Sequence, residues 1–541
     1  MATTNPETKL KLRPNQIEHF QRVAKILSNF YFYIDGSEMG TGKTYIATAL
    51  AITYNLPCIV VCPMTARKTW SNVFSKYNIG VYDLAETGGI LTYSTLRTRK
   101  GYQPKHGLLT RDDSGDGVQF FPTTLFTQIV KSGVLLIFDE CQKLKNTSAQ
   151  FRAASALIRH FYSVQSKSRI GLLSGTVMDK TEHAVNFLRM VGFITSRNLY
   201  SKIRGQVRLE GVEELHRWAK KINNETAINF IDDNPFKSTR KGSIEYVFKV
   251  FTDVIRPGVM SIMPRSKSSA IKDVKNGFYY MTKEAEEEYT MAIQSLSKST
   301  RYDPETRSVK RTQDNMGAIT KALMRIQRSK ASTMIRVAKE YLTKDLVDSN
   351  GDKVISKIIL FADYYEVIEY LLKELEEYNP VELTGRIVED KRWTSIDAFQ
   401  QQDSYTRVLI GNPLTGGLSV DLHDTTGKYP RYMFIMPGYR INELHQATGR
   451  TYRDGTVGTA YMRFFYGLTG IRENNILSAL SRKGEVMQHV HKEQSEDGVK
   501  FPNEYEEERE QVPEHIHPQF DDVNVSEQVL PIKNEDDFEK S

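Results

Sequence analysis

Residues 31–50 read YFYIDGSEMGTGKTYIATAL, and this stretch decides the expected fold. A β-rich apolar run, the loop 37–44 and a helical pattern follow one another, which is the strand–loop–helix context of a phosphate loop. Gly40 and Gly42 let the backbone turn its N–H groups toward phosphates, and Lys43 is long enough to reach the outer phosphates. A helix N-terminus at this point also favours an anion. The stretch therefore predicts a nucleotide site.

The other loop residues complete this site. Thr44 offers a hydroxyl to Mg²⁺, and Thr41 lies in the loop between the two glycines. Ser37 stands where the strict Walker pattern has its first glycine. We expect ATP and Mg²⁺ as cofactors, held by the loop backbone, Lys43 and Thr44.

A second motif, VLLIFDECQKLKN at 134–146, supplies the acidic half of the site. Its apolar strand ends at Asp139, the position of a Walker B aspartate that holds Mg²⁺. Glu140 follows directly and is predicted to orient and deprotonate the attacking water. The motif lies about 95 residues after the phosphate loop, at the end of an expected parallel strand. Together the two motifs predict hydrolysis of the terminal phosphate.

Short apolar runs alternate with helical patterns in two parts of the chain. The first part contains YFYIDG, CIVVCP, GILTYS, VLLIFDE and IGLLSG, and the second contains KIILFAD, PVELTG, RVLIGN, YMFIMP and AYMRFFYG. Such alternation is typical of βαβ units that build a buried parallel sheet. We therefore expect an α/β protein with lobes at about 10–195 and about 350–480.

These patterns divide the chain into four regions. They are an N-terminal ATP-binding lobe (1–195), a mixed, largely helical inter-lobe region (196–350), a C-terminal lobe (351–492) and an acidic tail (493–541). In the inter-lobe region, EAEEEYTMAIQSLSK and TKALMRIQRSKASTMIRVAKEYL have the apolar spacing of helices. The basic segment RSKSSAIKDVKNG fits either a solvated face or a surface that follows phosphates. Residues 97–133 are expected to form a loop-rich insertion.

The charge of the chain is strongly divided. The tail from Glu493 onward has 16 acidic and 4 basic residues and carries −12, so that residues 1–492 carry +19. A basic body suits a nucleic-acid partner. The tail is poor in apolar residues and is expected to be mostly disordered. It fits either a solubilising segment or an autoinhibitory mimic that competes with nucleic acid for a basic groove.

Cysteine and hydropathy patterns bear on the compartment. Cys58 and Cys62 lie in the apolar run CIVVC, which predicts a buried strand rather than a zinc knuckle. Three cysteines allow no disulfide framework, so a reducing compartment is expected. No run approaches the roughly 18 apolar residues that cross a bilayer, and the N-terminus has no apolar signal segment. We expect an intracellular protein of the cytoplasm or nucleus, or of the host cell or virion if it is viral, not secreted and without a membrane partner.

The motifs resemble those of the Swi/Snf-like ATPases of helicase superfamily 2. SEMGTGKT is similar to the family loop DEMGLGKT, DECQKLKN to DEAHRIKN, and LLSGTVMDK to LSGTPIQN. LRPNQ resembles the family segment LRxYQ, whose glutamine contacts adenine, and this implies that role for Gln16. CIVVCPMTARKTW and ILTYSTL resemble motifs Ia and Ib, KIILFADYYEVIEYLLKEL resembles motif IV, and NPLTGGLSVDLHD resembles motif V.

The most specific resemblance is HQATGRTYRDGT, which is similar to motif VI, QAxGRxxRxGQ, with Gln446, Arg450 and Arg453 in register. The resemblance spans roughly 12–465 and implies two RecA-like lobes with parallel sheets flanked by helices and an ATP site in the cleft between them. It implies that Arg453 and Arg450 reach across the cleft to the γ-phosphate, where an arginine stabilises the transferring charge. Gln142 stands where the family usually has histidine, and it can still hydrogen-bond to motif III.

Nucleic acid is expected to be contacted through phosphates, without base reading. The candidates are Thr65, Arg67, Ser94, Thr415 and Gly416. Trp70 and Trp393 either stack on bases or pack in the core. DNA is favoured over RNA because of the Swi/Snf resemblance, and the sequence does not say which proteins the chain binds.

Several functions stay open at this point. The first is a DNA-dependent ATPase that translocates along duplex DNA, and the second is a strand-separating helicase. A third is an RNA or transcript-release helicase in viral transcription, because the compact chain resembles the stand-alone helicase-like ATPases of phages and large DNA viruses. A catalytically silent nucleic-acid-binding scaffold belongs to another class, and Lys43, Asp139, Glu140 and Arg453 argue against it.

Overall fold

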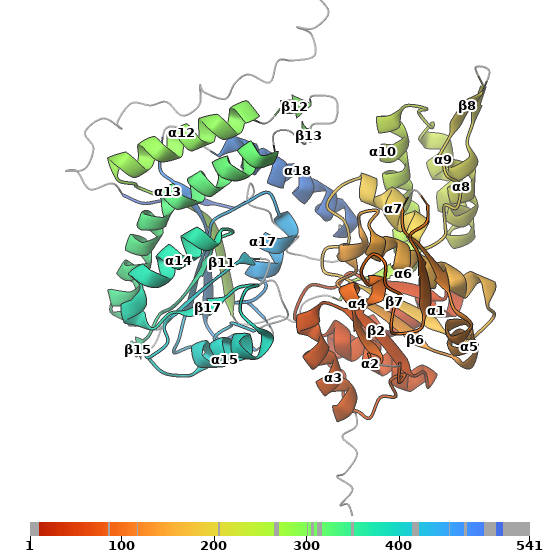
Figure 1. Ribbon diagram of the computed structural model, residues 1–541, viewed down its shortest axis with the longest axis horizontal. Coiled ribbons are helices and arrows are strands. Elements are labelled where there is room, and N and C mark those ends of the chain that lie inside the picture. Colours follow the sequence, from red (N-terminus) through yellow and green to blue (C-terminus); the bar gives the residue numbers. More distant parts are fainter. Residues whose placement is uncertain are drawn as a thin grey trace, which may run out of the picture.

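A computed structural model places the chain in two lobes that lie side by side (Figure 1). We call residues 10–263 lobe 1 and residues 270–511 lobe 2. The structure describes residues 10–84, 87–115, 117–203, 206–263, 270–299, 301–303, 308–310, 316–347, 351–413, 421–453, 455–469, 473–491 and 505–511.

Lobe 1 is built on a six-stranded sheet with the order β10-β1-β7-β6-β2-β3, and all its neighbouring strands are parallel. The strands are β1 (Phe32–Asp35), β2 (Cys58–Cys62), β3 (Ile90–Thr92), β6 (Leu135–Asp139), β7 (Arg169–Leu173) and β10 (Met260–Ser261). Alternate residues face two separate apolar clusters, with Phe32 and Ile34 in one and Tyr33 in the other. Burial on both faces explains why these strands read as continuous apolar runs.

Helices cover both faces of this sheet. They are α1 (Pro14–Asn29), α2 (Lys43–Tyr54), α3 (Arg67–Lys76), α4 (Tyr93–Arg97), α5 (Thr124–Ser132), α6 (Ala149–His160) and α7 (Glu182–Met190), with short 3-10 turns η1 (Met64–Ala66), η2 (Cys141–Leu144) and η3 (Phe161–Ser163). The expected loop-rich insertion at 97–133 contains α5 and an antiparallel hairpin of β4 (Leu109–Asp112) and β5 (Gln119–Pro122). Phe126 and Ile129 of α5 pack into the core, which makes this segment part of the lobe.

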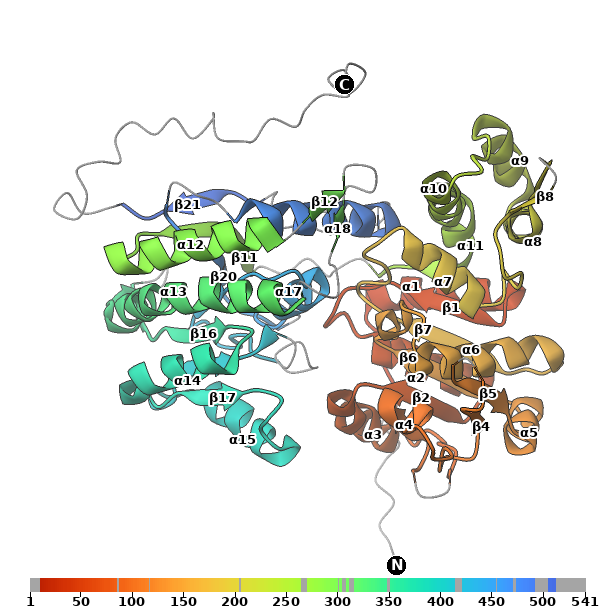
Figure 2. The same cartoon turned by 45° about the horizontal axis from the view of Figure 1, so that its top comes forward.

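A helical extension stands beside α7 at one end of lobe 1 (Figure 2). It consists of the hairpin β8 (Ser201–Ile203) and β9 (Gln206–Arg208), followed by α8 (Glu210–Ile222), α9 (Asn224–Asp233), α10 (Arg240–Val250), the π-helical η4 (Phe251–Ile255) and α11 (Arg256–Val259). Its apolar residues, among them Val212, Leu215 and Val247, belong to the same core cluster as the sheet. The extension is therefore packed as part of lobe 1.

Lobe 2 has a seven-stranded sheet with the order β17-β18-β16-β19-β20-β11-β21, again parallel throughout. The strands are β11 (Ile271–Tyr279), β16 (Lys357–Phe361), β17 (Val381–Leu383), β18 (Val408–Gly411), β19 (Arg431–Ile435), β20 (Thr459–Gly467) and β21 (Glu507–Arg509). The helices are α12 (Lys283–Ser299), α13 (Met316–Thr343), α14 (Tyr365–Glu374), α15 (Glu389–Gln400), α17 (Ile441–Thr448) and α18 (Asn474–His491), with the turn η6 (Glu376–Tyr378). Two small hairpins pair β12 (Arg301–Asp303) with β13 (Ser308–Lys310) and β14 (Leu346–Val347) with β15 (Lys353–Val354). The expected α/β fold with two parallel sheets flanked by helices is confirmed.

The region predicted as 196–350 is divided between the lobes. Its strand β10 extends the sheet of lobe 1, whereas β11 lies inside the sheet of lobe 2 between β20 and β21. The two predicted helices are present as α12 and α13, which pack on lobe 2. The basic segment before them contains strand β11, which the sequence did not predict. Lys275 and Asp273 of this strand form ion pairs with charged neighbours, so the strand lacks the apolar alternation that would have indicated it.

Part of the acidic tail also departs from the expectation of disorder. Strand β21 pairs with β11, and Arg463 bonds to both Glu508 and Asp273. Arg336 forms a second ion pair, with Glu510 at 2.7 Å. Ion pairs with basic residues of lobe 2 therefore hold this segment in place, although it has few apolar residues. Tail residues other than 505–511 lie outside the described part of the chain.

Helix α18 connects the two lobes (Figure 2). Ile476, Leu480 and Met487 pack in the core of lobe 2, whereas Val490 at its end packs in the core of lobe 1. The Val490 carbonyl also accepts a hydrogen bond from Arg256 Nη1 at 3.2 Å. Among the described residues, no helix combines the length and apolar character needed to cross a membrane.

Candidate nucleotide and nucleic-acid site

The loop between β1 and α2 has the backbone of a phosphate loop. Gly40 and Gly42 have φ angles of 78° and 101°, a region that L-residues rarely adopt. A Cβ on Gly42 would lie 2.4 Å from Gln16 Nε2, and one on Gly40 would lie 3.1 Å from Arg453 Cγ. Both glycines are therefore required by conformation and by close neighbours.

Gln16 from α1 fastens this loop. Its Nε2 donates to the Thr41 carbonyl at 3.1 Å, and its Oε1 accepts from the Arg13 backbone N–H at 3.0 Å. Gln16 is buried, so the amide holds the loop against the first helix. The structure places this residue at the nucleotide site, and its contact with adenine stays a prediction.

Lys43 opens α2 and folds back over the loop. Its Nζ donates to the carbonyls of Ser37 at 2.8 Å and Glu38 at 3.0 Å. An ammonium held by neutral carbonyls can exchange them for the charged oxygens of a phosphate, which are stronger acceptors. Thr44 follows on the first turn of α2 and is half-buried. This cradle fits the β- and γ-phosphates of a nucleotide.

The loop is also joined to the chain segment that leads into lobe 2. The Met263 backbone N–H donates to Ser37 Oγ at 2.8 Å, and Ser37 N–H donates to Asp35 Oδ1 at 3.0 Å. The other Asp35 oxygen lies 3.1 Å from His19 Nε2 in a fully buried pair. Ser37, at the position of the first Walker glycine, thus contributes a hydroxyl that glycine could not.

Asp139 and Glu140 lie at the carboxyl end of β6. Asp139 Oδ1 accepts from the Glu140 N–H at 3.0 Å, and Oδ2 accepts from Trp70 Nε1 at 2.8 Å. Burial and the adjacent Glu140 carboxylate raise the pKa of Asp139 to about 6, while the charge of Lys43 opposes that rise. Two crowded carboxylates next to a lysine fit a site completed by a cation. Mg²⁺ needs few protein ligands when phosphates and waters supply the rest, and Asp139 and Thr44 are the residues that would hold it.

A hydrogen-bonded chain runs from lobe 2 through Glu140 into lobe 1. Gln446 Nε2 on α17 donates to Glu140 Oε2 at 3.1 Å, and Gln142 donates to the same oxygen. Gln142 Oε1 accepts from Ser174 Oγ at 2.6 Å, and Ser174 Oγ accepts from the Thr176 N–H at 3.0 Å. Residues of motifs II, III and VI are therefore in direct contact, and a glutamine at position 142 makes the link to motif III.

The two arginines of motif VI lie against the phosphate loop. Arg453 packs on Gly40, donates from Nε to the Gly449 carbonyl at 2.9 Å and forms an ion pair with Asp421. Arg450 is fully buried, with Nη2 lying 3.9 Å from Met39 Sδ. Burial, and then the charge of Arg453, lower the pKa of Arg450 well below its ordinary value. Both residues face the nucleotide site, and their contact with a γ-phosphate stays a prediction.

The predicted nucleic-acid contacts of lobe 1 follow β2 and β3. Thr65 lies in η1, Arg67 begins α3 and is exposed, and Ser94 lies exposed on α4. Among the described residues, the buried Thr65 hydroxyl has no hydrogen-bond partner. Since β6, β2 and β3 are neighbours in the sheet, these residues share one edge with Asp139. Thr415 and Gly416 lie outside the described residues.

Sequence reasoning left the roles of the two tryptophans open. Trp70 is 1% exposed, so the base-stacking interpretation is wrong for this residue. Its indole N–H reaches Asp139, which places it in the nucleotide site. Trp393 on α15 packs on the core of lobe 2, and Lys68 Nζ of lobe 1 lies 5.2 Å from its ring centroid. The N–H of a buried tryptophan needs a hydrogen-bond acceptor. A tryptophan expected in the core could therefore have predicted a polar group beside it.

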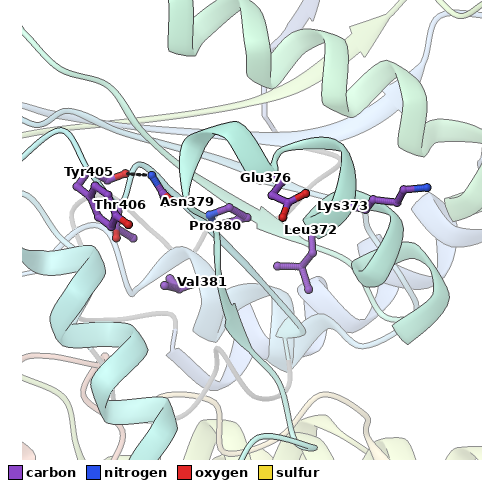
Figure 3. Close-up of a pocket in the computed structure, with 8 residues that line it drawn as sticks. All are labelled: Leu372, Lys373, Glu376, Asn379, Pro380, Val381, Tyr405 and Thr406. Atoms are coloured by element: carbon purple, nitrogen blue, oxygen red, sulfur yellow. Dashed lines mark hydrogen bonds between the residues drawn. The ribbon is translucent and has the colours of Figure 1, made fainter.

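A surface hollow of about 580 Å³ in lobe 2 lies away from these motifs (Figure 3). Leu372, Asn379, Val381 and Tyr405 line it, and Asn379 Nδ2 donates to the Tyr405 carbonyl at 3.3 Å. It lies at the amino ends of β17 and β18. Because ligands of parallel α/β sheets bind outside the carboxyl ends of strands, this hollow is not the nucleotide site.

The chain is similar to several known proteins. No family model matches the chain. A protein of Acanthamoeba polyphaga mimivirus, named as a putative ATP-dependent RNA helicase, is 23% identical over 499 residues, which cover 89% of this chain and 84% of the relative. The solved SWI2/SNF2 ATPase core of Sulfolobus solfataricus is 16% identical, both in complex with dsDNA (86% and 90% of the two chains, TM-score 0.30) and alone (88% and 89%, TM-score 0.32).

The phosphate loop, the acidic pair and the motif VI residues meet across two parallel-sheet lobes. This is the arrangement expected of an ATP hydrolase, and the motifs resemble those of the Swi/Snf-like ATPases of helicase superfamily 2. The similarity to the mimivirus protein extends along most of both chains.

Proposed function

We propose that this ATPase translocates along duplex DNA, with Lys43, Asp139 and Glu140 acting on Mg²⁺-bound ATP. The observation that carries the proposal is the hydrogen bond from Gln446 of lobe 2 to Glu140 of lobe 1. Glu140 is the residue predicted to activate water, so its environment depends on the position of lobe 2. Hydrolysis that depends on lobe position is the requirement for a motor and has no use in a passive scaffold.

The residues of this chain divide the chemistry as follows. The loop backbone and Lys43 bind and orient the phosphates, and Glu140 orients and deprotonates the attacking water. Arg453, released from Asp421, stabilises charge on the transferring phosphoryl group. Mg²⁺, when bound at Thr44 and Asp139, neutralises the phosphate oxygens. Closure of lobe 2 over the loop keeps bulk water from the site.

The expected mode of nucleic-acid binding supports DNA translocation. The exposed Arg67 and Ser94 offer a guanidinium and a hydroxyl, which are groups that contact phosphates. Phosphate contacts carry no sequence information, so the motor can advance along any sequence. The +19 charge of residues 1–492 supplies the general attraction. The Swi/Snf resemblance of the motifs favours duplex DNA over RNA.

An RNA or transcript-release helicase is the second candidate, because the mimivirus relative is named as an RNA helicase. The test is the steady-state ATPase rate without nucleic acid and with duplex DNA, single-stranded DNA or RNA, at one fixed salt concentration. Stimulation mainly by duplex DNA, with displacement of a third strand and no strand separation, is the expected result. Stimulation mainly by RNA or single strands would replace the proposal with the second candidate, and an unstimulated enzyme would refute both.

A further inference from the structure

Two segments that are predicted to contact nucleic acid both reach Asp139. Trp70 lies one turn into α3, the helix that begins at Arg67, and its Nε1 donates to Asp139 Oδ2 at 2.8 Å. Tyr93 lies next to Ser94, and its hydroxyl donates to the Asp139 carbonyl at 2.8 Å. One residue of motif Ia and one of motif Ib therefore hold the same aspartate, by its side chain and by its backbone.

Both contacts are shielded from water. Trp70 and Tyr93 are buried, and Trp70 packs edge-on against Phe74 with 5.3 Å between ring centroids. A buried carboxylate next to a second acid is costly, and a neutral N–H donor aimed at one oxygen offsets part of that cost. The donor also fixes the direction of the oxygens that remain available to a cation.

We propose that Trp70 and Tyr93 are positioning residues that transmit nucleic-acid contact at motifs Ia and Ib to Asp139, and so to Mg²⁺ and ATP turnover. The inference rests on the proposed function, since it concerns how nucleic acid stimulates the ATPase. A phosphate bound at Arg67 or Ser94 shifts α3 or α4, and each shift is felt at Asp139 through a single hydrogen bond. The path from nucleic acid to Asp139 is short, because Arg67 lies in the same helix as Trp70 and Ser94 lies next to Tyr93.

Trp70→Phe tests the first link, because phenylalanine keeps the aromatic packing and removes only the N–H. The Mg²⁺ concentration that half-saturates nucleotide binding should rise about tenfold, as expected for loss of a hydrogen bond to a charged group. Stimulation of ATP hydrolysis by nucleic acid should fall by a similar factor, while the affinity for nucleic acid stays within about twofold. Mg²⁺ dependence is the diagnostic readout, since general loosening of the lobe would not move it selectively.

Tyr93→Phe tests the second link, and Tyr82→Phe is its matched control. The Tyr82 hydroxyl also donates to a backbone carbonyl of lobe 1, that of Gly133, at 3.1 Å, but at the amino end of β6. Tyr93→Phe should lower nucleic-acid stimulation by about threefold, a smaller loss because its bond is to a neutral carbonyl. Tyr82→Phe should leave stimulation and Mg²⁺ dependence at wild-type values.

Fluorescence tests the first link without altering Trp70. The chain has three tryptophans, so the Trp218→Phe/Trp393→Phe protein emits from Trp70 alone. Its emission should change when Mg²⁺ is added with a non-hydrolysable ATP analogue, and change again on addition of the nucleic acid that stimulates wild-type enzyme. This measurement decides the matter even if Trp70→Phe fails to fold.

The outcomes separate this inference from the function on which it rests. The inference is overturned if Trp70→Phe keeps the Mg²⁺ dependence of the wild type. It is also overturned if Tyr93→Phe loses no more nucleic-acid stimulation than Tyr82→Phe, or if Trp70 emission changes with neither Mg²⁺ nor nucleic acid. If no nucleic acid stimulates the wild-type protein, the proposed function fails. A tenfold Mg²⁺ shift would then uphold the link between Trp70 and Asp139 and overturn its role in nucleic-acid coupling.

Discussion

Lobe 1 and lobe 2 share one architecture but hold their polar residues in opposite ways. In lobe 1, the phosphate loop and the acidic pair are bonded to their own lobe, as Lys43 is to Ser37 and Asp139 is to Trp70. The functional side chains of lobe 2 reach outward, since Gln446 bonds to Glu140 and Arg450 approaches Met39 of the other lobe. We therefore expect lobe 1 to bind the nucleotide by itself and hydrolysis to depend on the position of lobe 2.

Lys43→Ala should produce the largest effect, because it removes the cation of the built-in site. We expect ATP hydrolysis to be abolished and nucleic-acid binding to stay within a few-fold, since the predicted nucleic-acid contacts lie after β2 and β3. The measurement is the stimulated ATPase rate together with nucleic-acid affinity. Full turnover by this variant would refute the phosphate-loop assignment.

Arg453→Ala should separate binding from hydrolysis. Turnover should fall roughly a thousandfold, as for loss of an arginine that stabilises the transferring phosphoryl group, while lobe 1 still binds the nucleotide. The measurements are kcat and the affinity for a fluorescent ATP analogue. Arg407→Ala is the control, because this lobe 2 arginine bonds to Ser356 at the amino end of β18. If Arg453→Ala lost as much affinity for the nucleotide as turnover, lobe 1 would not bind the nucleotide independently of lobe 2.

Asp179→Asn should weaken the internal bonding of lobe 1 without touching the nucleotide. Asp179 of motif III bonds to Lys145 of motif II at 2.8 Å and to His183 at 2.9 Å. We expect a loss of about 2 kcal/mol in the free energy of unfolding, less than the about 3–5 for fully buried pairs because Lys145 is partly exposed. Urea unfolding measures it. Asp345→Asn, which breaks an exposed pair with Lys353, should change nothing measurable.

The pH dependence of that loss has a definite sign. Burial alone would raise the pKa of Asp179, but the hydrogen bond and charge of His183 and the charge of Lys145 hold it below its ordinary value. A lowered folded-state pKa stabilises the protein above the unfolded pKa of 3.8 and loses that effect as pH falls below it. The difference between Asp179→Asn and wild type should therefore be full at pH 7 and shrink at about pH 3. A constant difference would show that the charge is not involved.

The tail gives the smallest expected effect, and two truncations sharpen it. Removal of residues 512–541, with eight acidic and two basic residues, should tighten nucleic-acid binding a few-fold and leave the melting temperature unchanged. Removal from Glu493 onward should also tighten binding, but it exposes the edge of β11 and frees Arg463 from Glu508, so it should lower the melting temperature. Unchanged affinity and salt dependence in both would leave the tail as a solubilising segment.

Local patterns made much of the fold and of the site predictable. The run VLLIFDE is a buried strand because both faces of a parallel sheet are covered, and the glycines and lysine that mark the phosphate loop lie next to one another in the sequence. The same reasoning failed for β11 and β21, whose charged residues read as solvated segments. Their ion pairs join residues as far apart as Asp273, Arg463 and Glu508, and no short window contains them.

The sequence by itself determined which residues can bind phosphate, hold a cation and activate water, because those roles depend on residue type and on spacing within one turn or strand end. Only the tertiary structure decided which residues form three hydrogen bonds. Gln446 donates to Glu140, the Met263 backbone N–H donates to Ser37, and Trp70 donates to Asp139. The physical reason is that each of these bonds joins elements far apart in the chain, brought together by the packing of two sheets and their covering helices.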